Sequence, residues 1–184
     1  MNVPNIISIG RLLSVPVNVW LILLGEWRFA FLLFSLAGLS DAVDGMIAKH
    51  FNARTRLGLY LDPIADKVLL VSIFVVLGIQ ELLPLWLVVL VVSRDFLIVG
   101  GLLLLHMLDL TAEPRPRWSS KLNTVMQILT ATLVLAGMAF ELELHRAVYL
   151  ATFMLTGVTT AVSGADYLLE WGRRIGALDR TEQR

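Results

Sequence analysis

The residues of this chain best suited to chemistry are four aspartates in otherwise apolar segments: Asp41, Asp44, Asp62 and Asp66. A carboxylate at membrane depth is costly, so such residues mark functional sites by default. The spacings are i,i+3 and i,i+4, which place each pair on one face of a helix. Two helices that face each other across a small gap would then form a site for a hard cation. Oxygen ligands without His or Cys favour Mg²⁺ or Mn²⁺ over zinc.

The clustered charge predicts two bound metal ions. Four carboxylates repel one another strongly in a low dielectric. Two Mg²⁺ or Mn²⁺ ions between the carboxylates would neutralise their charge. The same ions would leave positive charge available to bind a phosphate-bearing ligand. The segment that joins the two pairs carries Lys49, Arg54 and Arg56. Lys and Arg pair with phosphate oxygens, so this basic segment suits the same ligand.

Small residues flank the aspartates. Gly45 and Ala48 follow the first pair, and Gly58 precedes the second. Glycine lets a ligand or a second backbone come close. Pro63 fits the first turn of a helix, which predicts Asp62 as the N-cap residue.

The composition predicts one all-α integral membrane domain over residues 1–184. Hydrophobic residues make up 57% of the chain, and the mean hydropathy of +0.77 is high for a soluble domain. Six apolar stretches are candidates for crossing a hydrocarbon core of roughly 30 Å: about 12–24, 29–47, 64–80, 83–105, 122–140 and 147–169. A short interfacial helix around Pro4–Leu12 is expected before the first span. Cysteine is absent, which excludes disulfides. No nucleic-acid partner is expected.

Lys and Arg are distributed unevenly between the two sides that six spans would create. Eleven fall in segments 1–11, 48–62, 106–121 and 170–184, whereas the opposite loops hold Arg28 and Arg146. This excess predicts that both termini and the mouth of the aspartate site are cytoplasmic. The N-terminus lacks the basic residues and cleavage pattern of a signal peptide, so the first span is expected to be retained.

The aspartate region resembles the signature of the CDP-alcohol phosphatidyltransferase family. That signature is D-x-x-D-G-x-x-A-R, eight residues, then G-x-x-x-D-x-x-x-D. The matching residues are Asp41, Asp44, Gly45, Ala48, Gly58, Asp62 and Asp66. Lys49 stands where Arg is usual, which keeps the charge but loses a bidentate grip on phosphate. An N-x-P-N…R pattern extends the resemblance towards the N-terminus through Asn2, Pro4, Asn5 and Arg11.

The resemblance implies a six-helix membrane enzyme with a cytoplasm-facing polar cavity, usually a homodimer. Such enzymes move a phosphatidyl group from CDP-diacylglycerol to an alcohol and release CMP. The implied metal ligands are Asp41, Asp44, Asp62 and Asp66, with Asp66 also the general base on the acceptor hydroxyl. The implied CDP site comprises Asp44, Gly45, Ala48, Lys49 and Gly58, with Arg54 as a diphosphate contact. The implied location is a bacterial inner membrane or the matrix-type side of a mitochondrial inner membrane.

Two further polar groups bear on the acceptor. Arg94 lies inside the fourth span in S-R-D, and Lys121 lies at the start of the fifth in S-K-L-N-T. Arg94 either forms a self-neutralising structural pair with Asp95 or binds an anionic acceptor together with Lys121.

The choice of acceptor lies between phosphatidylglycerol and glycerol 3-phosphate. The phosphatidylglycerophosphate synthase branch tends to carry extra cations where this chain has Leu102 and Asn123. Glycerol 3-phosphate is a dianion and should need those cations. The S-R-D…P-R…S-K-L-N-T combination instead resembles the cardiolipin synthases of the family. Phosphatidylglycerol is therefore the preferred acceptor, and glycerol 3-phosphate is the alternative.

Two rival functions use similar residues. An intramembrane prenyltransferase also binds diphosphates through aspartates and Mg²⁺, but it usually has two separate aspartate-rich motifs. A small divalent-cation transporter could use the carboxylates as its ion site. Neither accounts for the basic segment together with Gly45, Ala48 and Gly58.

Overall fold

The computed structural model describes the backbone of residues 3–51, 58–107 and 118–182, and the side chains of residues 10–40, 67–101 and 118–172. Within these ranges the chain forms six helices and no strand, which confirms the all-α prediction. They are α1 (Val3–Leu23), α2 (Trp27–Phe51), α3 (Gly58–Ile79), α4 (Leu85–Met107), α5 (Trp118–Ala139) and α6 (Arg146–Glu182).

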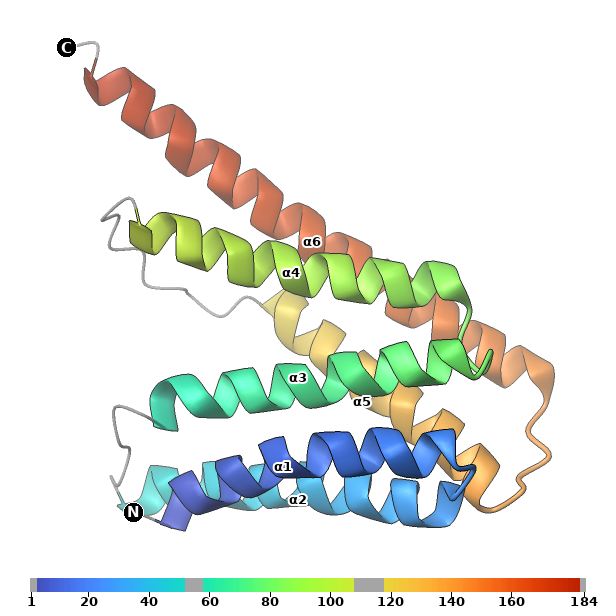
Figure 1. Ribbon diagram of the computed structural model, residues 1–184. Helices are drawn as coiled ribbons and strands as arrows, with labels where there is room; N and C mark the ends of the chain where they lie inside the picture. Colours follow the sequence, from blue (N-terminus) through green and yellow to red (C-terminus); the bar gives the residue numbers. More distant parts are fainter. Residues whose placement is uncertain (1–2, 52–57, 108–117, 183–184) are drawn as a thin grey trace.

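Successive helices run in alternating directions, so the helix ends form two groups (Figure 1). The turns that join α1 to α2, α3 to α4 and α5 to α6 lie at one end of the bundle. The end of α2 and the start of α3 lie at the opposite end, where the two chain termini are also found. α6 extends past the other helices at that end. The end of α2 and the start of α3, the two helices that carry the aspartates, therefore lie at the same end of the bundle.

The three short turns share one helix-capping arrangement. Gly25, Glu81 and Glu141 adopt left-handed backbone conformations, with φ values of 77°, 59° and 51°. In each turn the next residue donates its N–H to a carbonyl five residues back, at distances of 2.9, 2.9 and 3.0 Å. This bond satisfies a carbonyl that the helix end would otherwise leave unpaired.

The expected separate interfacial helix over Pro4–Leu12 is wrong, because α1 is continuous. Pro4 falls in the first turn, where a missing N–H costs no helical hydrogen bond. Pro16 lies inside the helix without ending it. The lost hydrogen bond is tolerable where neighbouring helices pack around the chain.

The predicted start of α3 is also wrong. The helix begins at Gly58, so Asp62 lies inside it and is not an N-cap residue. Glycine is acceptable at a helix start, and the fixed φ of Pro63 is compatible with a helix. Asp62 and Asp66 consequently sit on one continuous helix with an i,i+4 spacing.

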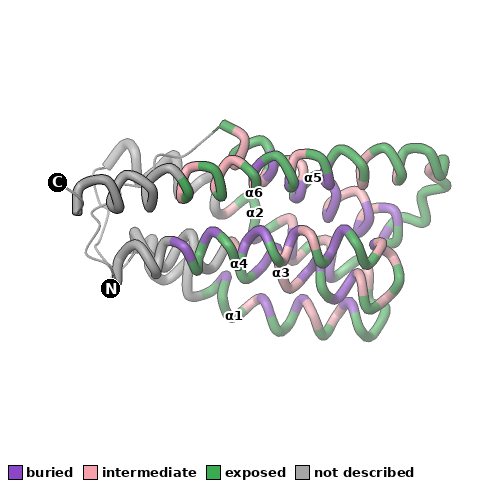
Figure 2. Tube along the Cα trace, turned by 90° about the horizontal axis from the view of Figure 1, so that it is seen from above, coloured by how far each residue is buried: buried purple, intermediate pink, exposed green. Residues whose placement is uncertain are grey.

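The interior is apolar, and so is much of the outer surface. α1 packs against α2 and α3, α5 packs against α2, α3 and α6, and α4 packs against α3 and α6. Ile22, Phe74, Leu77, Leu87 and Leu135 are fully buried in the centre. Figure 2 shows exposed residues along the outer faces, and large apolar side chains are exposed on all six helices: Leu13, Phe29, Ile79, Phe96, Leu129 and Val158 are examples. An apolar exterior of this extent marks contact with lipid or with other protein.

Two helices of the described chain are long and apolar enough to cross a membrane: Trp118–Ala139 and Arg146–Gly172. Shorter apolar stretches lie at Gly10–Leu23, Trp27–Ser40 and Lys67–Ile79. The two long helices and the apolar exterior fit association with a membrane.

Candidate active site

The aspartates lie on helical backbone, in the second half of α2 and the first half of α3. Asp41 and Asp44 belong to α2, and Asp62 and Asp66 belong to α3. Their side chains lie outside the described residues, as do those of Gly45, Ala48, Lys49 and Gly58. In the sequence Arg54 falls between α2 and α3, in a segment that the structure does not describe. Their predicted contacts with metal and CDP stay predictions.

The helical register relates the first aspartate pair to the core. Ala30, Phe34 and Ala37 form the buried stripe of α2. They follow the i, i+4, i+7 repeat that defines one face of a helix. Continuing the same repeat from Ala37 reaches Asp41 and then Asp44.

The second pair has the same relationship to α3. Leu69, Leu70 and Ile73 are buried. Asp66 precedes Leu70 by four residues and Ile73 by seven, and Asp62 precedes Leu69 by seven. Both pairs therefore occupy register positions that continue a core-facing stripe. α1 and α5 each pack against both helices, so α2 and α3 are held by common neighbours.

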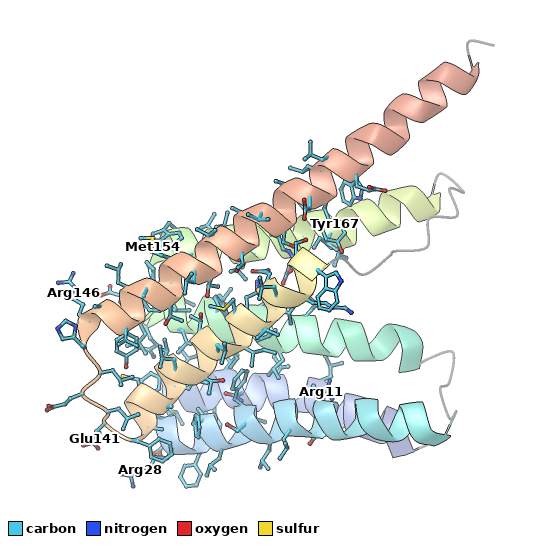
Figure 3. The ribbon with its side chains drawn as sticks, turned by 180° about the vertical axis from the view of Figure 1, so that it is seen from behind. Arg11, Arg28, Glu141, Arg146, Met154 and Tyr167 are labelled. Atoms are coloured by element: carbon cyan, nitrogen blue, oxygen red, sulfur yellow. The ribbon has the colours of Figure 1, made fainter. Side chains whose placement is uncertain are left out.

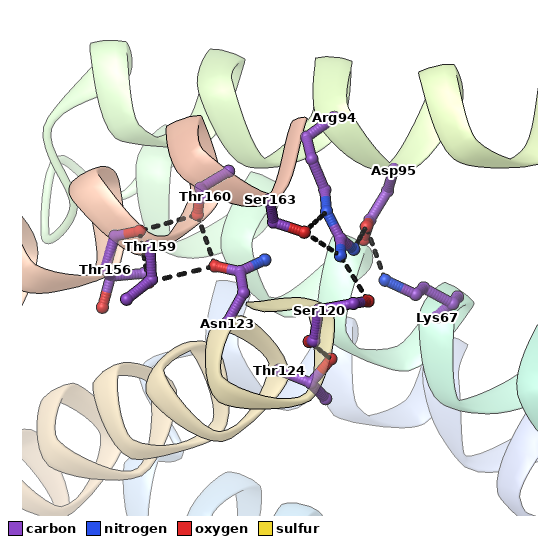
Figure 4. A network of polar contacts seen from close by, with 10 residues as sticks. All are labelled: Lys67, Arg94, Asp95, Ser120, Asn123, Thr124, Thr156, Thr159, Thr160 and Ser163. Carbon is purple, nitrogen blue, oxygen red and sulfur yellow. Dashed lines mark hydrogen bonds and ion pairs between the residues drawn. The ribbon is translucent and has the colours of Figure 1, made fainter. Parts of the chain in front are cut away.

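A largely buried cluster of polar side chains joins the four helices α3, α4, α5 and α6 (Figure 4). Arg94 of α4 is 2% exposed. Its Nη1 donates to Asp95 Oδ1 at 2.6 Å, and its Nη2 donates to Ser120 Oγ of α5 and Ser163 Oγ of α6, both at 2.6 Å. Its Nε also donates to Ser163 Oγ at 3.2 Å. Lys67 of α3 completes the cluster, because its Nζ donates to the same Asp95 Oδ1 at 2.5 Å. We call these five residues the Arg94 cluster.

The cluster includes the Arg94–Asp95 pair that the sequence offered as one alternative. Lys67 is the residue that sequence reasoning missed. The available signal was a lysine directly after Asp66 and within an apolar helix, where an unpaired cation is costly. Its partner lies on another helix, 28 positions away, so the pair becomes evident only in the fold.

Lys121 lies apart from these hydrogen bonds. Its side chain is exposed, and Nζ lies 5.2 Å from the centre of the Trp118 ring. That distance suits a cation–π contact. Arg94 also faces an aromatic ring, since its Cζ lies 5.9 Å from the ring centre of Tyr167, a residue of α6 labelled in Figure 3. The two predicted acceptor residues are thus placed differently, one buried and one at the surface.

A line of polar side chains continues from the Arg94 cluster along the α5–α6 interface. Asn123 Oδ1 accepts hydrogen bonds from Thr160 at 2.7 Å and Thr159 at 3.2 Å. Thr130 and Thr156 hydroxyls lie 2.6 Å apart further along. Both amide atoms of fully buried Gln127 lack a hydrogen-bond partner among the described residues. Hydrogen bonds between helices suit a lipid environment, where unsatisfied polar groups are costly.

Glycines fix how α6 lies against α4 on either side of Arg94. A Cβ at Gly157 would lie 2.7 Å from the Trp86 ring, and one at Gly101 would overlap the Trp171 ring. Between these points, a Cβ at Gly164 would lie 3.7 Å from Arg94 Cγ. The two helices thus run side by side in the same direction, with close contacts about two turns apart. This packing holds Ser163 against Arg94.

A model of the family described as CDP-alcohol phosphatidyltransferase matches residues 1–163 of the chain. The match includes the four aspartates, the basic segment and the Arg94 cluster.

Three curated relatives illustrate the similarity. A "Cardiolipin synthase (CMP-forming)" from Homo sapiens is 32% identical over 189 residues, covering 94% of this chain and 62% of that protein. A "Probable cardiolipin synthase (CMP-forming)" from Drosophila melanogaster is 31% identical over 185 residues, covering 92% and 57%. A "CDP-diacylglycerol--glycerol-3-phosphate 3-phosphatidyltransferase 1, chloroplastic" from Oryza sativa subsp. japonica is 33% identical over 189 residues, covering 93% and 57%. The chain thus spans 57–62% of the length of these relatives.

Proposed function

Because the chain belongs to the CDP-alcohol phosphatidyltransferase family, we propose that it moves the phosphatidyl group of CDP-diacylglycerol to a glycerol-type acceptor and releases CMP. The observation that carries this proposal is the register of α2 and α3. The buried stripes of both helices continue in register into the four aspartates, towards the end of the bundle where α2 ends and α3 begins. Two carboxylate pairs that extend core-facing stripes suit an enclosed site better than a solvated surface.

We propose Asp41, Asp44, Asp62 and Asp66 as ligands of two Mg²⁺ or Mn²⁺ ions. An all-oxygen donor set on two helices fits these hard cations. The part of the chain with described side chains holds no other group of three or more His, Cys, Asp or Glu suited to a metal. Bound metal would polarise the diphosphate and stabilise the leaving CMP.

The proposed reaction exchanges the phosphoanhydride bond of the CDP-diacylglycerol diphosphate for a phosphate ester bond to the acceptor. The acceptor hydroxyl oxygen forms a bond to the phosphorus of the phosphatidyl group, and the bond from that phosphorus to the CMP oxygen breaks. Asp66 takes the hydroxyl proton as attack proceeds. Asp44, Gly45, Ala48, Lys49 and Gly58 line the CDP site, with Arg54 as a further diphosphate contact.

Phosphatidylglycerol is the proposed acceptor, which would make the chain a cardiolipin synthase. The names of the human and Drosophila relatives support this choice. The rice relative supports glycerol 3-phosphate as the alternative acceptor. Arg94 and Lys121 are proposed to contribute positive charge to the acceptor site.

The proposed setting is an integral membrane protein with six spans, a cytoplasm-facing cavity, cytoplasmic termini and a homodimeric assembly. Exposed apolar side chains on all six helices support membrane burial. The end of α2, the start of α3 and the end of α4, which border basic segments, lie at one end of the bundle, which supports a single cationic side.

The test is CMP release by the purified chain in bilayer discs with CDP-diacylglycerol, Mg²⁺ or Mn²⁺ and one acceptor at a time. We expect cardiolipin and CMP in equal amounts from phosphatidylglycerol. Product from glycerol 3-phosphate but none from phosphatidylglycerol would establish the alternative acceptor. Metal flux into proteoliposomes without CMP release would instead identify a cation transporter.

A further inference from the structure

We propose that Lys67 is the cation that contacts the phosphate of the acceptor, and that Arg94 and Asp95 are positioning residues that hold Lys67 in place. The proposal rests on the proposed function and adds a specificity residue to it. Phosphate is the chemistry that phosphatidylglycerol and glycerol 3-phosphate share, so either acceptor would use this contact.

The first argument is the charge of the Arg94 cluster. Two cations, Lys67 and Arg94, share a single oxygen of Asp95. The three side chains together carry one excess positive charge. Excess charge enclosed by apolar helices is costly unless another group neutralises it. An anionic ligand at the cluster would supply that charge.

The second argument is the number of hydrogen-bond donors that remain. The guanidinium of Arg94 is directed to Asp95, Ser120 and Ser163 through Nη1, Nη2 and Nε. An ammonium has three N–H donors. Lys67 uses one of them, to Asp95, among the described residues. Among the described residues two donors of Lys67 therefore remain for a ligand, whereas four of the five N–H donors of Arg94 are already directed to protein oxygens.

The third argument is access. The side chain of Lys67 is 30% exposed, whereas the side chains of Arg94 and Asp95 are 2% and 5% exposed. A ligand can reach the ammonium of Lys67 but not the guanidinium of Arg94 without moving helices. Asp95 also stays partnered while Lys67 turns to a ligand, because Arg94 holds the same oxygen.

The fourth argument is position along α3. Lys67 follows directly after Asp66, the proposed general base. Ser120 and Ser163 anchor the other side of the cluster to α5 and α6. A phosphate held at Lys67 would thus be held by the same helix that carries the residue proposed to deprotonate the acceptor.

The absence of cysteine permits a test in a single folded protein. Lys67→Cys introduces one thiol, which 2-bromoethylamine converts to a lysine-like ammonium and 2-bromoethanol converts to a neutral group of similar size. We expect Lys67→Cys to raise the KM for phosphatidylglycerol roughly tenfold or more, the loss of about one hydrogen bond to a charged group. The KM for CDP-diacylglycerol should change by less than about twofold. Aminoethylation should restore the acceptor KM, and hydroxyethylation should not.

Arg28→Gln is the matched control. Arg28 also joins two helices, since its Nε donates to the Ala139 carbonyl at 3.1 Å, but it lies at the opposite end of the bundle. Its loss should leave both KM values unchanged. The Lys67 assignment is overturned if the unmodified enzyme is active and Lys67→Cys leaves the acceptor KM unchanged or raises the KM for CDP-diacylglycerol instead. Equal recovery of the acceptor KM after treatment with 2-bromoethylamine and with 2-bromoethanol would also overturn the Lys67 assignment. An unmodified enzyme that releases no CMP with either acceptor would refute the proposed function itself.

Discussion

Lys67 Nζ donates to Asp95 Oδ1 at 2.5 Å across the α3–α4 interface. This contact ties the helix that carries Asp62 and Asp66 to the helix that carries Arg94. Because Arg94 in turn reaches α5 and α6, the Arg94 cluster links four of the described helices. The Arg94 cluster is therefore a structural centre as well as a candidate part of the acceptor site.

Replacement of Asp95 should destabilise the fold strongly. Asp95→Ala leaves Arg94 buried and Lys67 partly buried without their shared carboxylate. Removing one partner of a buried ion pair costs about 3–5 kcal/mol. Because Lys67 is partly exposed, we expect a loss of unfolding free energy near the lower end of this range. Thermal unfolding in detergent should show a clearly lower midpoint, and an unchanged midpoint would show that the cluster contributes little to stability.

The close α4–α6 contact predicts a graded glycine series. Gly101→Ala should destabilise, because the new methyl would overlap the Trp171 ring, and Gly157→Ala should do so less, because its Cβ would lie 2.7 Å from Trp86. Overpacking of this kind typically costs about 1–3 kcal/mol. Gly164→Ala is the control, since its Cβ would meet Arg94 Cγ at an ordinary 3.7 Å. Equal unfolding midpoints for the three variants would contradict the described helix register.

The left-handed turn residues predict substitutions that stabilise. Glu81 and Glu141 occupy a backbone conformation that costs an ordinary residue about 1–2 kcal/mol. Glu81→Gly or Glu141→Gly should therefore raise the free energy of unfolding, by about 1 kcal/mol after glycine's greater unfolded-state entropy is counted. Gly25→Ala tests the same geometry in the opposite direction and should destabilise by a similar amount. Chemical denaturation in mild detergent measures the free energy of unfolding of all three variants.

Local features of the fold could be predicted from the sequence, whereas contacts between distant helices could not. Apolar stretches and aspartate spacing predicted six helical segments in the right order because hydrophobicity and helical period are local properties, although α1 begins earlier and α6 ends later than the predicted spans. The start of α3 was misplaced because Pro63 suggested a first turn, yet the helix begins earlier, at Gly58. Lys67 was missed for another reason. Its role depends on Asp95, which only the packing of α3 on α4 brings near.

The final prediction separates the two roles proposed for Asp66. Asp66→Asn should reduce turnover by at least about 10²-fold, the usual scale of general-base loss, while binding of CDP-diacylglycerol changes little. The amide keeps an oxygen for the metal but cannot accept the acceptor proton. Turnover is measured as CMP release and binding as retention of radiolabelled CDP-diacylglycerol, both in bilayer discs. Asp41→Ala is the comparison. It removes both ligand oxygens of a residue proposed only as a metal ligand, so substrate binding and activity should fall together and recover in part at high Mg²⁺. If Asp66→Asn also lost binding and recovered with Mg²⁺, Asp66 would act mainly as a metal ligand and the base would have to be another group.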